Sequence, residues 1–208
     1  MLADTGSHVI DMARFVVGGE VARVLARSRT FIERRPIAGR PDEFGVVDTD
    51  DLTDLMLEFD NGALGSVTLA RTYPGHNTDM GFEVVGSKGS ILFSWLRPTE
   101  LQFYSMDDPD ELRGNRRMLI GKMHPNADAF WGRGIAIGYT DAFLIQFHLM
   151  LQAIEGAADG DRASFGDGVR AAEVIESAIE SAAEERWASV PTPPGGPHAA
   201  VPAAKGAR

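Results

Sequence analysis

The sequence predicts an α+β fold, in which an open, mainly antiparallel β-sheet is covered by helices on one face in a two-layer arrangement. Between residues 20 and 105, apolar and polar residues alternate as they do in half-buried strands. These segments are joined by tight-turn signals such as Asn61-Gly62, a pair that favours a two-residue hairpin. Helical periodicity occurs before this region and again after residue 139. Segregated strands and helices are typical of α+β domains.

The chain is predicted to begin with a helix followed by a strand. Residues 7–17 have a helical apolar period, and Gly18-Gly19 ends it because glycine adopts the left-handed cap conformation. A strand is expected from Val21, and residues 34–50 are predicted to be a polar, proline-bearing loop. The helix is expected to place four apolar residues on one side: Val9, Met12, Ala13 and Val16.

Two hairpins and a further strand are expected next, giving a meander of at least five strands. One hairpin turns at Asn61-Gly62 and the other at residues 86–89, and residues 99–105 form the further strand. Residues 107–138 have no clear period, and an irregular segment of this length in a compact domain indicates a functional loop.

Two helices and a tail complete the predicted domain. In residues 140–156, Phe143, Phe147, Met150 and Ile154 form an apolar stripe. The second helix opens with Ser164 and Asp167 at the spacing of a capping box. This helix is expected to bury Val169, Ala172, Ile175 and Ile179. A short strand is expected near residues 188–193. Residues 1–190 are thus one domain, and the Pro-, Gly- and Ala-rich residues 191–208 are expected to be disordered.

Composition excludes several classes of partner. The formal net charge is −10, which disfavours nucleic acid and anionic membranes because both require a basic surface. No apolar stretch reaches the roughly 18 residues of a membrane span. The absence of cysteine excludes disulfides and thiolate chemistry and fits a cytoplasmic location.

The first candidate site is at the start of the chain. Asp4 and His8 are four residues apart, so on a helix their side chains lie one above the other, and Asp11 follows on the same stripe. A carboxylate beside an imidazole fixes its tautomer and suits general acid–base catalysis. The alternative is that Asp4 caps the helix and His8 is a surface residue. No third metal ligand is evident, so no metal site is predicted.

Four more residues are candidate substrate contacts. Arg71 lies where a strand leaves the sheet, and His124, Tyr139 and Asp141 flank the irregular segment. The alternatives are that Arg71 is an exposed strand-end residue and that Tyr139 and Asp141 cap the following helix. The glycines at positions 132, 134 and 138 miss the dinucleotide-binding spacing by one residue and do not follow a strand, so no cofactor-binding residue is predicted.

The segment ADTGSHVIDMARF resembles the D-x-G-x-H-x-x-D helix of the glucose–fructose oxidoreductase / inositol dehydrogenase / MocA (Gfo/Idh/MocA) family. Three later segments resemble that family in the same order: DDLTDLMLEFDNGALGSVTLAR, FEVVGSKGSILF and SFGDGVRAAEVIESAIESA. The resemblance covers roughly residues 2–190. Several motifs in the correct order make it more specific than any one of them.

The resemblance implies the substrate-binding and oligomerisation domain of an NAD(P)-dependent oxidoreductase that acts on the CH–OH group of a sugar, cyclitol or related polyol. Its sheet would be like that of the dihydrodipicolinate-reductase C-terminal domain. In this family the histidine matching His8 is the general base and the aspartate matching Asp4 orients it. The four further candidates, Arg71, His124, Tyr139 and Asp141, would contact substrate.

The family's nucleotide-binding Rossmann domain, with its G-x-G-x-x-G loop and Glu-Lys-Pro motif, has no counterpart in this sequence. We therefore expect this chain alone to bind no NAD or NADP and to be inactive. A non-catalytic binding or assembly module is the alternative. A small hydrolase that uses Asp4 and His8 as a dyad is a weaker one, since no nucleophile motif is present. Apolar residues on both faces of the strands, such as Leu57 against Met56, indicate a homo-oligomer formed through the open sheet face.

Overall fold

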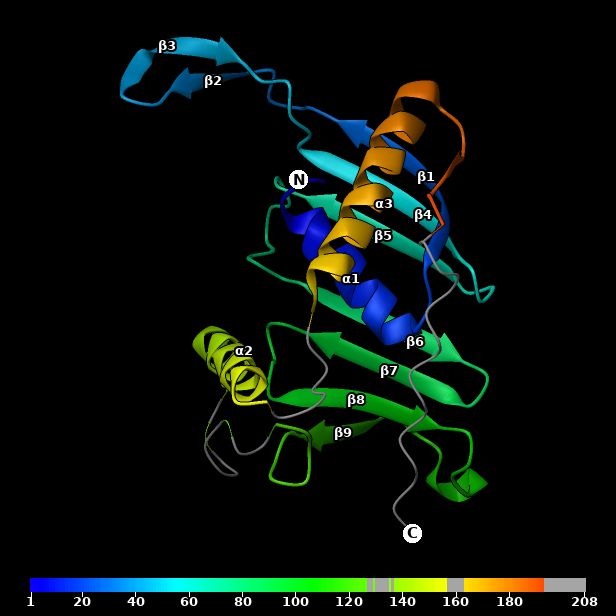
Figure 1. The fold of residues 1–208 in the computed structure, drawn as a ribbon. Helices are drawn as coiled ribbons and strands as arrows, with labels where there is room; N and C mark the ends of the chain where they lie inside the picture. The colour runs from blue at the N-terminus through cyan, green and yellow to red at the C-terminus, as the bar shows by residue number, and fades with distance from the viewer. Residues whose placement is uncertain (127–128, 130–134, 136, 157–162, 193–208) are drawn as a thin grey trace. The chain divides into compact units, whose positions relative to one another are not determined.

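A computed structural model describes residues 1–126, 129, 135, 137–156 and 163–192 (Figure 1). The chain divides into two compact units. The first comprises Met1–Gly75 with Ala163–Arg208, and the second comprises His76–Arg162. Each unit has its own four-stranded antiparallel sheet, so the strands predicted as one meander are distributed between two sheets. The units are described separately below.

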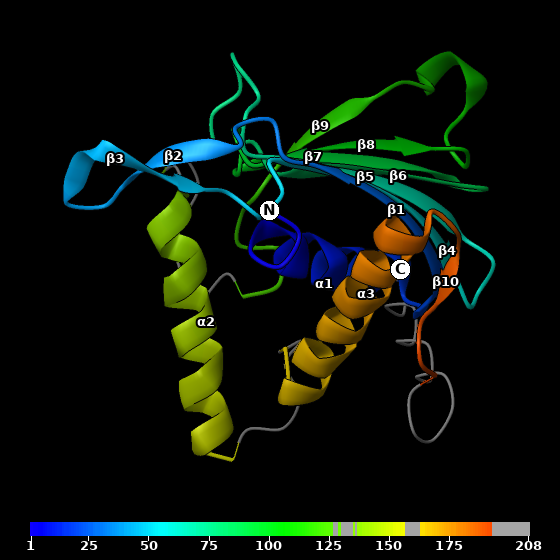
Figure 2. The same cartoon turned by 90° about the horizontal axis from the view of Figure 1, so that it is seen from above.

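The first unit is a sheet covered by two helices. Its strands are β1 (Val21–Arg29), β4 (Leu52–Phe59), β5 (Leu64–Ala70) and the short β10 (Ala188–Ser189), in the order β10-β1-β4-β5. Helices α1 (Thr5–Val17) and α3 (Phe165–Glu184) pack against each other on one face of this sheet (Figure 2). Gly62 has a φ of 86° at the β4–β5 turn, as the Asn-Gly signal predicted.

The register of the first sheet separates a core face from an outer face. Val24 pairs with Leu57 and Ala26 with Leu55, and all four side chains are buried beneath the helices. Met56, between two buried leucines, points outward and is 55% exposed. The predicted alternation of strand β4 is therefore confirmed.

The buried face of α1 agrees in part with the predicted one, and that of α3 differs from it. In α1 the buried residues are Gly6, Ile10 and Arg14. Val9 and Ala13 of the predicted stripe are partly buried against the core, and Met12 and Val16 are half-buried. In α3 the predictions for Val169, Ala172 and Ile179 were wrong, since all three are exposed and only Ile175 is buried. The buried face of α3 includes charged and small polar side chains that a hydrophobic period cannot detect: Arg170, Ser177 and Ser181. The hydroxyl of Ser181 accepts from the backbone N–H of Ala26 at 2.9 Å, which draws α3 close to β1.

The predicted loop at residues 34–50 is instead largely a two-stranded hairpin, formed by β2 (Arg34–Ile37) and β3 (Arg40–Val46). Gly39, with a φ of 75°, supplies the left-handed residue of its turn. The prolines at positions 36 and 41 suggested a loop. A two-stranded ribbon has two open edges, however, and proline is tolerated where no ladder hydrogen bond is required of it.

The second unit is a true meander. Strands β6 (Gly81–Gly86), β7 (Gly89–Ser94), β8 (Glu100–Ser105) and β9 (Arg116–Leu119) pair in sequence order. A 3-10 helix, η1 (Asp110–Leu112), precedes β9, so part of the segment predicted to be irregular is ordered. Helix α2 (Tyr139–Ile154) follows. None of its described residues is buried, and its predicted stripe, Phe143, Phe147, Met150 and Ile154, is exposed.

Some predictions concern residues outside those described. They are Gly132 and Gly134 of the glycine-rich near-motif and residues 193–208 of the tail. Among the described residues, no helix is long and apolar enough to cross a membrane.

Candidate functional site

Asp4 is the residue immediately before α1, yet its carboxylate does not cap the helix. Its backbone carbonyl instead accepts a hydrogen bond from the Ser7 hydroxyl at 2.7 Å. The carboxylate is 75% exposed, and its Oδ2 atom lies 3.8 Å from Nη2 of Arg71, the residue that follows β5. The first unit thus brings two of the predicted site residues together and leaves the Asp4 carboxylate available to a ligand.

Gly6 explains how the start of α1 approaches the end of β5. A Cβ atom on Gly6 would lie 2.9 Å from Cδ1 of Leu69 and 3.3 Å from Cδ1 of Leu2, and both leucines are buried. The glycine between Asp4 and His8 is therefore a packing requirement. It allows the helix to lie on the sheet at the point where Arg71 leaves it.

His8 lies one helical turn beyond Asp4, and its side chain is exposed. Within the described part of the chain, no hydrogen bond joins its imidazole to the Asp4 carboxylate. Asp11, the third polar residue of the predicted stripe, has a different partner, since it accepts from Nη1 of Arg14 at 3.2 Å. The stripe therefore divides into an exposed pair, Asp4 and His8, and a structural residue, Asp11.

Arg14 belongs to a buried ion network that ties α1 to α3. Its guanidinium donates to both carboxylate oxygens of Glu20, at 2.9 and 2.7 Å, and Arg170 of α3 donates to Glu20 at 3.1 Å. The side chains of all three residues are no more than 7% exposed. The hydrogen bonds from Arg14, helped by those from Arg170, hold the pKa of the Glu20 carboxyl below its usual value although burial opposes this. The network fixes the helix that carries the exposed pair.

Two adjacent aspartates, Asp50 and Asp51, hold together the segments that meet at the start of β4. Asp50 accepts from the hydroxyl of Thr53 at 2.7 Å and from the backbone N–H of Leu2 at 2.9 Å, which connects the segment before α1 to β4. Asp51 is almost fully buried. Its carboxylate accepts from the N–H groups of Phe31 and Ile32, at 2.8 and 2.9 Å, and its backbone carbonyl accepts from Arg71 N at 2.8 Å. Sequence reasoning missed both residues because Leu2, Phe31 and Ile32, whose N–H groups they accept, are distant along the chain.

The other three predicted contacts lie in the second unit. The Asp141 carboxylate accepts the N–H of Gly138 at 2.7 Å, so it caps α2, as the alternative interpretation held. Tyr139 is exposed and lies edge-on to the rings of Trp95 and Phe143. Nδ1 of His124 accepts the N–H of Gly121 at 3.0 Å within a turn, which leaves Nε2 available for a ligand.

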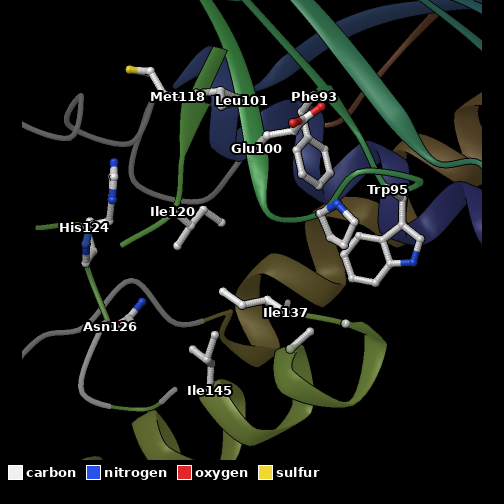
Figure 3. A pocket seen from close by; sticks show the side chains of 14 residues that line it. Phe93, Trp95, Glu100, Leu101, Met118, Ile120, His124, Asn126, Ile137 and Ile145 are labelled. Atoms are coloured by element: carbon white, nitrogen blue, oxygen red, sulfur yellow. The ribbon is translucent and has the colours of Figure 1, made fainter. Parts of the chain in front are cut away.

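His124 also lines a pocket of about 420 Å³ that is formed entirely by the second unit; we call it the second-unit pocket. Figure 3 shows isoleucines across its middle, Phe93 and Trp95 at one end, and His124 and Asn126 at the opposite end. The pocket has the size of a small-molecule site. Its walls come from β7, β8, β9, the turn after β9 and the start of α2, an assembly that no local sequence pattern reveals. Most of the wall is apolar: Phe93, Leu101, Met118, Ile120, Ile137 and Ile145.

The helix N-termini among the described residues are acidic, which disfavours a pyrophosphate there. A pyrophosphate binds where helix N-termini present free N–H groups. Here an acidic residue stands at or near the start of each of the three helices: Asp4 precedes α1, Asp141 caps α2 and Asp167 caps α3. These carboxylates would repel a phosphate. No cluster of three His, Cys, Asp or Glu side chains that could hold a metal occurs among the described residues either.

The fold and site together define a class: an α+β domain of the kind that forms the C-terminal half of dinucleotide-dependent oxidoreductases. Residues 1–92 match the model of the GFO/IDH/MocA C-terminal domain. This is the family that the opening motif predicted.

Two kinds of relative illustrate the relationship. The levoglucosan dehydrogenase of Pseudarthrobacter phenanthrenivorans is 38% identical over 203 residues, which cover 91% of this chain and 51% of the relative. The inositol 2-dehydrogenase of Rhizobium meliloti is 27% identical over 187 residues, covering 90% of this chain and 48% of that protein. The chain therefore spans about half the length of the curated relatives it matches.

Solved structures agree with these relatives. The complex of levoglucosan dehydrogenase with NADH and levoglucosan has a TM-score of 0.83 and 38% identity, covering 91% of this chain and 50% of that one. An oxidoreductase domain protein from Kribbella flavida has a TM-score of 0.85 and 30% identity, with coverage of 91% and 51%.

Proposed function

We propose that this chain is the substrate-binding and oligomerisation part of an NAD(P)-dependent oxidoreductase that acts on a CH–OH group of a sugar, cyclitol or related polyol. The observation that carries the proposal is the Asp4-x-Gly6-x-His8 start of α1. Its carboxylate is ion-paired to Arg71 instead of being used as a helix cap. The relatives named for levoglucosan and inositol support this class of substrate.

The chemistry that we assign to the chain is the proton half of the reaction. Oxidation of an alcohol to a ketone removes a hydride from the carbon and a proton from the oxygen. His8 would accept the hydroxyl proton, and Asp4, held by Arg71, would orient the imidazole and stabilise its charged form. Arg71, His124 and Tyr139 remain proposed substrate contacts, and Asp141 is proposed as a positioning residue. Asp141 would act through the start of α2, which its carboxylate fixes.

The hydride acceptor would be bound elsewhere in the complete enzyme. NADH accompanies the levoglucosan dehydrogenase structure, and the acidic helix N-termini of this chain disfavour a pyrophosphate. That this chain alone binds no NAD or NADP remains a prediction.

The proposal is tested by dehydrogenase assays of the complete reading frame that contains this chain, with NAD and NADP and with levoglucosan and inositols as substrates. Loss of a general base costs roughly 100-fold or more in rate, so His8→Ala should lower kcat by at least that factor. His148→Ala is the matched control, because His148 on α2 is hydrogen-bonded to Gln152 of the same helix. A kcat that His8→Ala leaves unchanged would favour the alternative, a non-catalytic binding module.

We also propose that the chain forms homo-oligomers through the outer face of its sheet, in the cytoplasm. Met56 and Leu64 are exposed there, on strands β4 and β5, and a sheet face of this kind is commonly covered by a partner. Light scattering at micromolar concentration should give a mass above that of one chain. Met56→Lys should lower that mass, whereas Val46→Lys on the β2–β3 hairpin should not. A monomeric mass for the unmodified chain would contradict the proposal.

A further inference from the structure

Asp4 lies outside the helix that carries His8, so its position requires an anchor of its own. His8 belongs to α1, which the buried ion network fixes, whereas Asp4 precedes the first residue of that helix. The pair that Asp4 forms with Arg71, 3.8 Å apart, cannot be this anchor, because both side chains are exposed and exposed ion pairs contribute little stability. The segments that carry these two side chains are therefore brought together by other, more buried contacts.

The carboxylate of Asp50 holds the segment that leads into α1. It is only 18% exposed, and its Oδ2 atom accepts the backbone N–H of Leu2, two residues before Asp4, at 2.9 Å. The nitrogen of Met1 lies 2.7 Å from the other carboxylate oxygen. The carbonyl of Met1 in turn accepts the N–H of Gly6 at 3.1 Å, which closes a turn around Asp4. Asp50 thus anchors the base of the turn that presents the Asp4 carboxylate.

Thr53 fixes the orientation of the Asp50 carboxylate. Thr53 is fully buried, and its hydroxyl donates to Asp50 Oδ2 at 2.7 Å. Because a hydroxyl has only one proton, the hydroxyl of Ser28, 2.7 Å from that of Thr53, is the donor between these two groups. Two successive hydrogen bonds therefore run from β1 through β4 to the carboxylate and hold it in the orientation that Leu2 requires.

The neighbouring residue, Asp51, holds the other partner of the pair. Its backbone carbonyl accepts the N–H of Arg71 at 2.8 Å, which extends the β4–β5 ladder one residue beyond the pairing of Leu52 with Ala70. Consecutive Cα atoms are only about 3.8 Å apart. The segments that carry Asp4 and Arg71 are thus held by adjacent residues, which leaves little freedom in their separation.

We infer that Asp50 and Asp51 are positioning residues for the proton transfer assigned to His8. Asp50 places the Asp4 carboxylate through its side chain. Asp51 places Arg71 through its backbone carbonyl. This inference rests on the proposed function for the reaction and adds the residues that set the geometry of the site. Displacement of a catalytic group by about 1 Å can lower a rate roughly 100-fold, so the loss of such an anchor is expected to appear in kcat.

The test is Asp50→Ala in the complete reading frame, under the assay conditions of the His8→Ala comparison. It should lower kcat by about 10- to 100-fold and leave KM within about twofold, since it displaces the Asp4 carboxylate and none of the substrate contacts. Asp48→Ala is the matched control, because Asp48 is exposed and only two residues away, and its kcat should equal the native value. Val190→Ala, just after β10 at the opposite edge of the sheet, is the control for lost stability. It should lower the urea midpoint without lowering kcat.

A double substitution separates positioning from general damage. In the Asp4→Asn background, Asp50→Ala should change kcat by no more than about twofold, because the charge that Asp50 places has been removed. Structural damage would lower kcat by the same factor in both backgrounds. If Asp50→Ala does not fold, as judged by circular dichroism, Thr53→Val takes its place in the same comparison. That variant keeps the shape of the buried side chain and removes one of the two hydrogen bonds to Asp50 Oδ2.

Amide hydrogen exchange of this chain gives a readout that requires no turnover. In Asp50→Ala the N–H of Gly6 should exchange at least about tenfold faster relative to that of Val190, the factor expected when a hydrogen bond to a charged group is lost beneath the turn. The N–H of Val190 is the internal reference because it donates to Ala22 O at 2.9 Å, away from the turn.

A native kcat in Asp50→Ala, an equal loss in the Asp4→Asn background, or unchanged relative exchange at Gly6 would each overturn the inference. Failure of the proposed function is recognised separately, as a complete protein without dehydrogenase activity or one whose kcat His8→Ala leaves unchanged. In that case the exchange measurement still decides whether Asp50 holds the turn that carries Asp4.

Discussion

At the scale of single residues, Gly6 links the sequence motif to the fold. The D-x-G-x-H pattern first suggests chemistry, but its glycine is explained by packing, because a Cβ there would lie 2.9 Å from Leu69 Cδ1. Asp4 and His8 remain on the surface while the residue between them contacts the core. The same five residues thus serve two purposes that the sequence alone does not separate.

Gly6→Ala should destabilise the chain. Overpacking lowers the free energy of unfolding by about 1–3 kcal/mol, and the better helix propensity of alanine offsets only part of that loss. Gly168→Ala is the control on α3: no atom lies within 4 Å of its added Cβ, so it should stabilise by roughly 0.5–1 kcal/mol. Urea unfolding measures both changes. In a Leu69→Ala background the cost of Gly6→Ala should disappear, and an unchanged cost there would refute the proposed clash.

The candidate site could be predicted only where it depends on local spacing. Asp4 and His8 were found because a helix places residues four apart on one face. The Arg71–Asp4 contact, the role of Asp51 and the pocket around Trp95 all require elements that are distant in sequence to meet. Hydrophobic periodicity carries no information on contacts between distant elements, so these features were visible only in the structure.

At the scale of elements, the position of α1 depends on a buried charge. Glu20 accepts from Arg14 of α1 and Arg170 of α3, and this polar centre occupies the face that a hydrophobic period would assign to apolar residues. A hydrophobic period therefore missed buried Arg14 in α1 and buried Arg170 in α3. The strands were predicted better, since the two-residue alternation of β4 is free of buried charges.

Glu20→Gln should cost about 3 kcal/mol or more in the free energy of unfolding. It removes the buried carboxylate that joins two buried guanidinium groups, and breaking a buried pair carries a penalty of this size. The other ion-pair partners of Arg14 and Arg170, which are Asp11, Asp167 and Glu173, are more exposed than Glu20. The matched control is Glu43→Gln, which breaks the exposed Arg40–Glu43 pair of the β2–β3 hairpin and should cost less than about 1 kcal/mol. Similar losses in chemical denaturation for the two variants would contradict the assigned importance of the network.

At the scale of the whole molecule, acid stability follows from carboxylates whose pKa values are lowered in the folded state. For Asp51 the hydrogen bond from Ile32 N–H is the largest cause, and further hydrogen bonds from Phe31 and Arg35 act in the same direction against the effect of burial. The pKa of Glu20 is lowered as well. A lowered folded-state pKa stabilises the chain above the unfolded-state value and loses that contribution as pH falls through the folded-state value.

The free energy of unfolding should therefore be steady from neutral pH to about pH 5 and fall below about pH 4, near the ordinary carboxyl range. Asp51→Asn should make the chain less stable at pH 7 and flatten this acid decline. Asp48→Asn, at an exposed position, should change neither property. Urea midpoints at a series of pH values measure the effect, and parallel declines in the native chain and Asp51→Asn would rule out Asp51 as a source of it.

The hairpin of β2 and β3 has a consequence for how this domain can vary. Strands β1 and β4 pair with each other as far as Arg29 and Leu52, so the pairing within the sheet does not depend on the hairpin that lies between them in sequence. The hairpin is attached through Asp51, which binds the backbone at residues 31 and 32 and the side chain of Arg35. A homologue with a shorter, longer or different hairpin can therefore keep the same helices, sheet and Asp4–His8 pair.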